Sequence, residues 1–166
     1  LLACTNATLI RLGKTHLLQA ICTQILADKI DSQILYLSCE DFVNQFIEGV
    51  KDGHLEGFRY KYRNVDMLLI DDIHFLADKP RIQEEFFHTF NTLYNAQKQI
   101  VLSADCNPGE IPTLNERLIS RFKWGLVSRI DPPEYETRAA ILKKKSSLRG
   151  YDLSDQVISL LEIGRA

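Results

Sequence analysis

Val65-Asp66-Met67-Leu68-Leu69-Ile70, followed directly by Asp71-Asp72, is the stretch that decides the fold of this chain. The apolar run at positions 67–70 is typical of a central strand buried on both faces, as strands of parallel sheets are. The two carboxylates come where that strand ends. The sequence therefore predicts a buried parallel strand that delivers two acidic side chains to the carboxyl edge of a sheet.

Short apolar runs alternate with amphipathic stretches on either side of this strand. Such alternation predicts an α/β fold, a parallel sheet with helices on both faces. Further strands are expected in residues 1–7, 34–37, 100–102 and 126–130, and helices in residues 14–28, 42–50, 55–62, 80–96, 113–121, 134–147 and 154–163.

Two of these helices carry specific expectations. The first has its apolar residues at helical spacing, which places Leu17, Leu18, Ile21, Ile25 and Leu26 on one face. Thr113 and Glu116 have the spacing of a capping box and predict the start of the later helix.

Composition limits the classes of function. The chain has 166 residues, 45% of them hydrophobic and 25% charged, as in an ordinary soluble globular protein. A net charge of -2 gives no overall basic surface, so any nucleic-acid contact must come from a local patch. No apolar run reaches membrane-spanning length. The widely spaced cysteines, Cys4, Cys22, Cys39 and Cys106, are expected to be free thiols, which favours a cytoplasmic protein.

Gly13-Lys14-Thr15 lies between an expected strand and an expected helix, the context of a phosphate-binding loop. Backbone N–H groups and the helix dipole would face the phosphates there. Lys14 would contact the β- and γ-phosphates, and the Thr15 hydroxyl would bind Mg²⁺. An ordinary turn is the alternative interpretation of these three residues.

The loop departs from the full pattern G-x-x-x-x-G-K-[ST]. Its first glycine is replaced by Thr8, and Arg11 stands where a compact loop prefers a small residue. A β-branched residue resists the backbone angles that glycine adopts. These two residues predict weak or absent nucleotide binding and leave open whether the chain is an active ATPase. Loss of ATP binding in this chain and a damaged N-terminal end are both compatible with the departure.

Asp71 and Asp72 have the arrangement of a Walker B motif. Asp71 would hold Mg²⁺, directly or through water. Asp72 would orient or deprotonate the attacking water. A pair of acids capping the next turn is the alternative, and the Gly-Lys-Thr upstream favours the Walker interpretation.

Several stretches together resemble the DnaA family of bacterial replication initiators. They are 12-LGKTHLL-18, 65-VDMLLIDDIHFL-76, 83-QEEFFHTFN-91, 98-KQIVLSAD-105 and 116-ERLISRFKWGL-126. The resemblance implies a P-loop NTPase fold of the AAA+ class: a five-stranded parallel sheet flanked by helices, then a helical lid. We therefore expect an AAA+ α/β domain in residues 1–132 and the beginning of the lid in residues 133–166, both truncated. Pro132-Pro133 marks the expected boundary.

The resemblance also assigns roles to residues that the motifs alone do not. It implies binding of ATP with Mg²⁺, His16 belonging to the nucleotide-binding stretch and Asp105 being the sensor of the γ-phosphate. Arg117 matches an arginine finger that reaches the ATP of a neighbouring subunit, and Arg121 a second interface arginine, in a filament assembled on the replication origin.

Three further residues match the single-stranded DNA channel of the family: Ile47, Lys79 and Arg81. Lys79 and Arg81 precede a helix whose opposite face is apolar, so solvated side chains free to meet phosphate are expected. Ordinary surface charge is the alternative for both, and Ile47 taken alone suggests core.

Two alternatives to an ATP-dependent initiator follow from the same residues. One is a regulator that docks on an active initiator as an interaction module, with little or no nucleotide binding. The other is a helicase loader of related fold. A replicative helicase or its loader is also a possible partner of the initiator.

Overall fold

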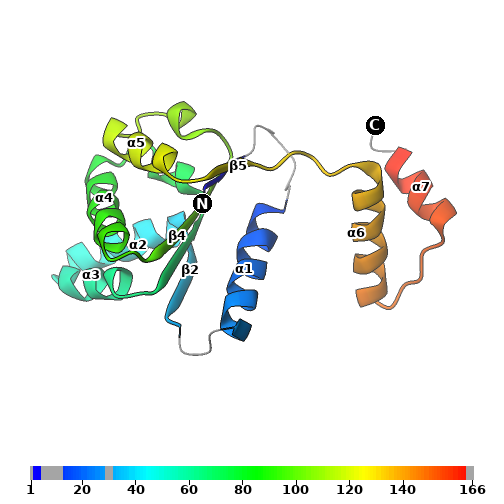
Figure 1. The fold of residues 1–166 in the computed structure, drawn as a ribbon, viewed down its shortest axis with the longest axis horizontal. Coiled ribbons are helices and arrows are strands. Elements are labelled where there is room, and N and C mark those ends of the chain that lie inside the picture. Colours follow the sequence, from blue (N-terminus) through cyan, green and yellow to red (C-terminus); the bar gives the residue numbers. More distant parts are fainter. Residues whose placement is uncertain (1, 5–12, 29–31, 164–166) are drawn as a thin grey trace. The chain divides into compact units, whose positions relative to one another are not determined.

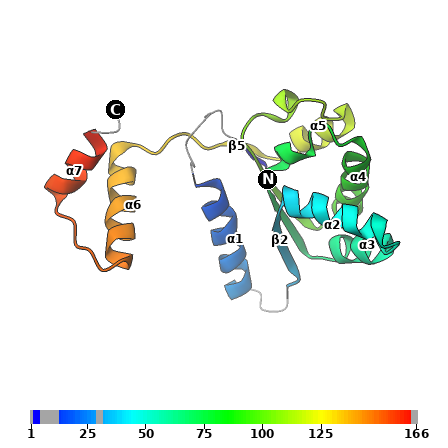
Figure 2. The ribbon, with the colours of Figure 1, turned by 180° about the vertical axis from the view of Figure 1, so that it is seen from behind.

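The computed structural model describes residues 2–4, 13–28 and 32–163, and Figures 1 and 2 show it from opposite sides. The chain divides into two compact units, Leu1–Ile130 and Asp131–Ala166. Each unit is described by itself below.

The first unit is built on one sheet whose paired strands all run parallel. Its five strands lie in the order β2-β3-β4-β1-β5. Their bounds are β1 Leu2–Cys4, β2 Ile34–Ser38, β3 Met67–Asp71, β4 Gln99–Ala104 and β5 Val127–Arg129. Every residue of β3 is buried, as its apolar sequence predicts. Of the first expected strand, residues 1 and 5–7 lie outside the described part.

Helices cover both faces of this sheet, as the alternating pattern predicts. They are α1 Lys14–Asp28, α2 Cys39–Lys51, α3 Leu55–Arg63, α4 Pro80–Asn95 and α5 Glu116–Trp124, with short 3₁₀ turns η1 Ile73–Leu76 and η2 Pro108–Glu110. α1 lies on one side of the sheet, and α2 to α5 lie on the other (Figures 1 and 2).

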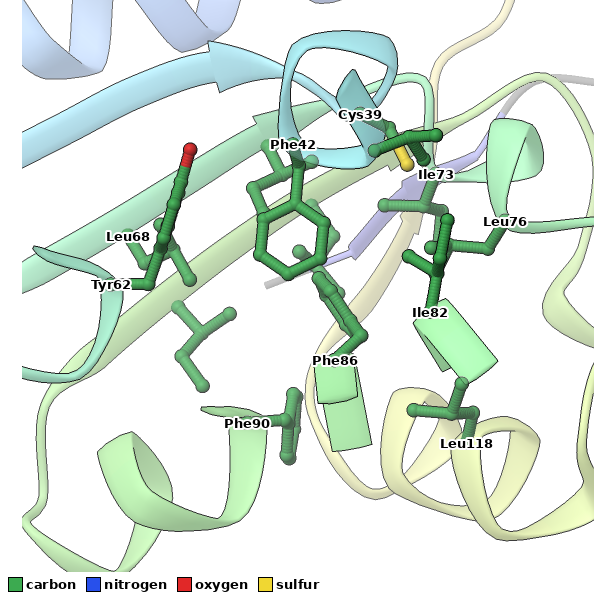
Figure 3. Close-up of a cluster of buried hydrophobic side chains, with 14 of the residues drawn as sticks. Cys39, Phe42, Tyr62, Leu68, Ile73, Leu76, Ile82, Phe86, Phe90 and Leu118 are labelled. Atoms are coloured by element: carbon green, nitrogen blue, oxygen red, sulfur yellow. The ribbon is translucent and has the colours of Figure 1, made fainter. Parts of the chain in front are cut away.

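The face under α2 to α5 holds the main hydrophobic core, drawn in Figure 3. Phe42 of α2 lies at its centre and packs edge-on against Phe58, Tyr62 and Phe86, with ring centroids 4.9–5.4 Å apart. Edge-to-face contacts are a preferred arrangement of aromatic pairs. The alternate residues Leu68 and Ile70 of β3 complete this core from the sheet side.

The α1 face is much more lightly packed. Its buried cluster consists of Leu18, Met67, Leu69 and Val101. On the apolar face of α1, Leu18 is buried and Ile21 and Ile25 are partly buried, whereas Leu17 and Leu26 are 44% and 48% exposed. Within the described part of the first unit, α1 is the helix that lies on this side of the sheet, so helical spacing alone overstates burial.

The start of α5 differs from the expected capping box. Asn115, not Thr113, is the N-cap, and its side chain accepts from the backbone N–H of Arg117 at 2.9 Å. Thr113 has a left-handed backbone, with φ 55°, and its hydroxyl bonds to Asp78 at 2.9 Å. A contact with a distant loop therefore replaces the local cap.

The second unit consists of α6, Tyr135–Leu148, and α7, Asp155–Ile163, which pack side by side. Ile158 is buried between them, at 3% exposure, and Lys143 pairs with Asp155 at 3.0 Å. Among the residues described, none of the helices has the length and apolarity needed to cross a membrane.

Candidate nucleotide-binding site

The predicted phosphate-binding residues lie at the N-terminus of α1. Gly13 has φ +90°, a conformation that residues with a Cβ rarely adopt, and its carbonyl accepts the first helical hydrogen bond, from Leu17, at 2.8 Å. The free N–H groups of the first helical turn therefore follow directly after Gly13. Thr8 and Arg11, which carry the expectation of weak binding, lie outside the described residues.

Lys14 points across the carboxyl edge of the sheet to the neighbouring strands. Its amine donates to the carbonyl of Ala104 at 3.2 Å and forms a close ion pair with Asp105. Asp72 lies 3.9 Å from the same amine. The Lys14 side chain is only 10% exposed, so these acidic groups hold a nearly buried charge. The expected convergence of the lysine with the strand-end acids is present.

Asp71 ends β3 and is buried, with 5% exposure. Its Oδ2 accepts from the Thr15 hydroxyl at 2.6 Å, and its Oδ1 accepts from the hydroxyl of Ser103 on β4. The same Ser103 hydroxyl accepts from the backbone N–H of Asp72 at 2.9 Å. Ser103 was not expected at the site. The signal that could have found it is a hydroxyl two residues before Asp105 in an apolar strand.

Asp72 follows with a left-handed backbone, φ 62° and ψ 52°. A non-glycine residue in this conformation is uncommon and is found most often where the surrounding structure requires it. The turn directs its carboxylate toward Lys14 and leaves 38% of the side chain exposed. Asp72 is thus the more solvent-exposed acid, whereas both oxygens of Asp71 accept hydrogen bonds from side-chain hydroxyls.

His74 and Asp105 complete this edge. The Nδ1 atom of His74 lies 3.8 Å from an oxygen of Asp105 and has no hydrogen-bond partner among the described residues. Donor atoms of Asp72, His74 and Asp105 lie within 4.8 Å of one another. His16, expected in the nucleotide-binding stretch, is exposed on α1. His74 was also missed, because a lone histidine in a turn carries no local signal.

Tyr36 of β2 lies beside Asp71 on the α1 face. Ser38 is the register partner of Asp71, so Tyr36 occupies the diagonal position, within reach of a long aromatic side chain. Burial raises the pKa of Tyr36, and the charge of Asp71 raises it further. Both effects favour the neutral phenol next to the buried carboxylate.

The donor set fits a magnesium ion. Thr15 and Asp71 offer a hydroxyl and a carboxylate oxygen in contact, and Mg²⁺ prefers such oxygen ligands. Lys14, also at this edge, offers an ammonium suited to phosphate oxygens. The edge can therefore accept a polyphosphate together with its cation.

The predicted DNA-binding residues lie on α2 and at the start of α4. Ile47 is 39% exposed, and Arg81 is exposed. Lys79 is half-buried, and its amine donates to the carbonyls of Phe75 and Ala77 at 2.7 and 3.4 Å. The Lys79 ammonium is therefore partly solvated, and backbone carbonyls of the preceding turn accept two of its hydrogen bonds.

The two predicted interface arginines lie one helical turn apart on α5. The guanidinium of Arg117 lies 4.7 Å from the ring centroid of Phe87. Arg121 lies 5.8 Å from the ring of Tyr94 and 5.4 Å from that of Trp124, which is 69% exposed. Stacking of this kind leaves the N–H groups of an arginine available for another partner.

Known proteins resemble this chain over most of its length. Residues 8–129 match the family model of the bacterial DnaA ATPase domain. The chromosomal replication initiator protein DnaA of Caldanaerobacter subterraneus subsp. tengcongensis is 56% identical over 148 residues, which are 89% of this chain and 33% of the relative. The chain thus spans about a third of the length of the curated relatives it matches.

Solved structures of DnaA proteins are also similar to this chain. Domain III of the Thermotoga maritima replication initiation protein DnaA is 39% identical, with a TM-score of 0.90, and the match covers 96% of this chain and 66% of that one. A replication initiator DnaA bound to AMPPCP and single-stranded DNA is 38% identical, with a TM-score of 0.83, over 96% of this chain and 49% of that one.

The likeness to helicase loaders concerns the fold alone. The DnaC helicase loader is 17% identical, with a TM-score of 0.67, over 79% of this chain and 77% of that one. The comparisons therefore support the initiator interpretation and not the loader or regulator. With a lysine, a threonine and three acids meeting at the carboxyl edge of an AAA+ sheet, this chain belongs to the bacterial DnaA ATPase domain family.

Proposed function

We propose that this chain is the ATP-binding core of a chromosomal replication initiator that assembles on origin DNA. The observation that carries the proposal is the meeting of Lys14, Thr15, Asp71 and Asp72 at one edge of the sheet. The names of the relatives support the rest, since they are chromosomal replication initiators, and one is bound to AMPPCP and single-stranded DNA.

Each residue of the edge has a role that its environment favours. Lys14 exchanges Asp105 for the phosphates of the incoming nucleotide, and Asp105 is then released to sense the γ-phosphate. Thr15 and Asp71 would hold Mg²⁺, which supplies charge neutralisation to the phosphates when bound. Asp72, the more exposed carboxylate, orients the attacking water. Gly13 and His16 border the phosphates from α1.

In this proposal, α5 supplies the residues that contact a neighbouring subunit in the filament. Arg117 reaches the nucleotide of a neighbouring subunit, and Arg121 contacts that subunit, so hydrolysis depends on filament formation. Support comes from the exposure of Arg117 and from the aromatic rings that hold both guanidinium groups.

Single-stranded origin DNA is the proposed ligand of Ile47, Lys79 and Arg81. Arg81 supplies the exposed charge, whereas Lys79 must first leave its backbone acceptors. The filament acts in the cytoplasm, on the chromosome, with a replicative helicase or its loader as a further partner. Residues 133–166, which contain α6 and α7, belong to a helical lid domain in this proposal.

A binding titration tests the central claim. A fluorescent ATP analogue is added to the chain in the presence of Mg²⁺, and the Kd is compared with that of Lys14→Ala. Loss of the ammonium is expected to weaken binding at least roughly tenfold, because a charge-assisted contact to phosphate disappears. Lys98→Ala is the matched control, since Lys98 pairs with Asp66 at 2.8 Å at the opposite edge of the sheet. Equal affinities of the Lys14 and Lys98 variants would show that nucleotide does not bind at the carboxyl edge of the sheet.

Thr8 and Arg11 set the strength of binding within this proposal. The wild-type chain is expected to bind weakly, and Thr8→Gly is expected to tighten binding by restoring the first glycine of the loop. Affinity of the wild type at the level of Thr8→Gly would show that the loop tolerates threonine at this position.

A further inference from the structure

Ser103 is the buried polar residue that contacts both acids of the site. It lies on β4 and is fully buried, at 0% exposure. The register of β3 and β4 pairs Leu69 with Val101 and Ile70 with Leu102. Continued by one residue, it brings Ser103 opposite Asp71, at the point where the two strands end.

A single hydroxyl makes both contacts. A serine hydroxyl has one donor and two acceptor positions. The donor is directed to Oδ1 of Asp71, and an acceptor position receives the N–H of Asp72 at 2.9 Å. Ser103 therefore fixes the side chain of one acid and the backbone of the next.

The backbone hydrogen bond lies in the left-handed turn at Asp72. The N–H in question belongs to the residue with φ 62° and ψ 52°, a conformation that a non-glycine residue keeps only when its surroundings require it. Without this hydrogen bond, the peptide between Asp71 and Asp72 loses a restraint in the turn that aims Asp72 at Lys14.

The two oxygens of the buried Asp71 carboxylate have different partners. Oδ1 of Asp71 is occupied by Ser103 from β4, and Oδ2 faces Thr15 of α1 at 2.6 Å. Hydrogen bonds from outside the ligand shell fix the orientation of metal ligands and affect metal affinity strongly.

We propose that Ser103 is a positioning residue that orients Asp71 toward the magnesium site and holds Asp72 in its left-handed turn. Through these two acids, Ser103 allows Mg²⁺ to increase the affinity of the site for nucleotide. The inference rests on the proposed function. It adds a residue that touches neither nucleotide nor metal and acts through the two acids.

The test measures the Kd of a fluorescent ATP analogue in Mg²⁺ and in EDTA. The gain in affinity from Mg²⁺ is expected to fall roughly tenfold or more in Ser103→Ala, while the Kd in EDTA stays within about twofold. Ser103→Thr keeps the hydroxyl and should restore the gain. Thr89→Val is the matched control, because the Thr89 hydroxyl is equally buried but has no hydrogen-bond partner among the described residues.

The outcomes separate the two proposals. An unchanged gain from Mg²⁺ in Ser103→Ala, or equal weakening with and without Mg²⁺, overturns the positioning role and leaves the nucleotide site intact. A wild-type chain that does not bind nucleotide, or binds it without any gain from Mg²⁺, overturns the proposed function and this inference with it. Ser103→Cys, of nearly the same size but a weak donor, replaces the alanine variant if that variant does not fold.

Discussion

The two faces of the sheet are built in different ways. Under α2 to α5, interlocking aromatic rings around Phe42 fill a continuous core (Figure 3). Under α1, the buried cluster has four members among the residues that the structure describes, and α1 itself contributes Leu18. Apolar burial therefore anchors one side of the sheet far more strongly than the other.

The candidate site takes residues from both the heavily packed and the lightly packed parts of the unit. Asp71 and Asp72 follow a strand that the main core holds, whereas Lys14 and Thr15 belong to α1. The contacts of α1 at its N-terminus are polar: Lys14 to Asp105 and Thr15 to Asp71. Segments with few buried apolar contacts open at lower free-energy cost than the core. We therefore expect the acidic half of the site to be the more rigid one and the basic half to adjust to a nucleotide.

Phe42→Ala should give the largest loss of stability. Phe42 is fully buried and contacts three other rings, so truncation leaves a cavity that the core cannot close. The free energy of unfolding is expected to fall by about 3–5 kcal/mol. Urea denaturation followed by far-UV circular dichroism measures it. A loss below about 1 kcal/mol would contradict a single tightly packed core on this face.

Leu18→Ala tests the lighter face. Leu18 is 2% exposed, but the residues around it are partly open to solvent and can move into the space. We expect a loss of about 2 kcal/mol, the low end for such a truncation. Hydrogen exchange should also be faster in α1 than in α4, before and after the change. Losses as large as those of Phe42→Ala would mean that the two faces are equally packed.

Glu85→Gln tests a polar support of the main core. Glu85 of α4 is buried and accepts from Arg59 at 2.8 and 3.0 Å and from Arg63 at 2.5 Å, both on α3. Because both arginines are partly exposed, the expected loss is about 1–2 kcal/mol at neutral pH.

The same pair of helices gives a dependence on pH. Burial opposes ionisation of Glu85, but Arg59 and then Arg63 outweigh it and hold the pKa of Glu85 below its ordinary value of 4.5. A lowered pKa in the folded state contributes stability above pH 4.5 that is lost as the pH falls through the folded value. Unfolding curves of wild type and Glu85→Gln should therefore approach each other in acid. A difference independent of pH would assign the loss to packing.

The sequence predicts the layers of this fold better than the packing between them. The apolar run of β3 and the alternation of strands and helices are local patterns, and they foretell the parallel sheet. The strand order β2-β3-β4-β1-β5 depends on contacts between distant segments. For the same reason, Leu17 and Leu26 have the spacing of an apolar helix face but are exposed among the described residues.

The candidate site divides in the same way. Lys14, Thr15, Asp71 and Asp72 form recognisable motifs, so their meeting at one edge could be expected. Ser103 could not, because a serine in an apolar strand gains its meaning from the register that brings it opposite Asp71. Lys79 shows the reverse case, in which carbonyls of the preceding turn accept from an ammonium that was predicted to be free.

Thiol labelling gives the smallest effect and the sharpest comparison of the two faces. Cys22 is half-buried on the α1 side, whereas Cys39 is fully buried at the start of α2. Burial raises the pKa of Cys22, and burial raises the pKa of Cys39 to about 12, so little reactive thiolate exists at Cys39 near pH 8. A Cys4→Ser, Cys106→Ser background leaves only these two thiols. Cys22 should react with a disulfide reagent through local opening of α1, and Cys39 only through global unfolding.

Bound nucleotide should distinguish local opening of α1 from global unfolding. By adding its own contacts to Lys14 and Thr15, saturating nucleotide should slow labelling of Cys22, with a tenfold change in rate for each ~1.4 kcal/mol of added local stability. A reagent that reaches Cys22 as slowly as Cys39 without nucleotide would mean that α1 opens only when the whole unit unfolds. The basic half of the site would then be as rigid as the acidic half, and the light packing under α1 would have no consequence for binding.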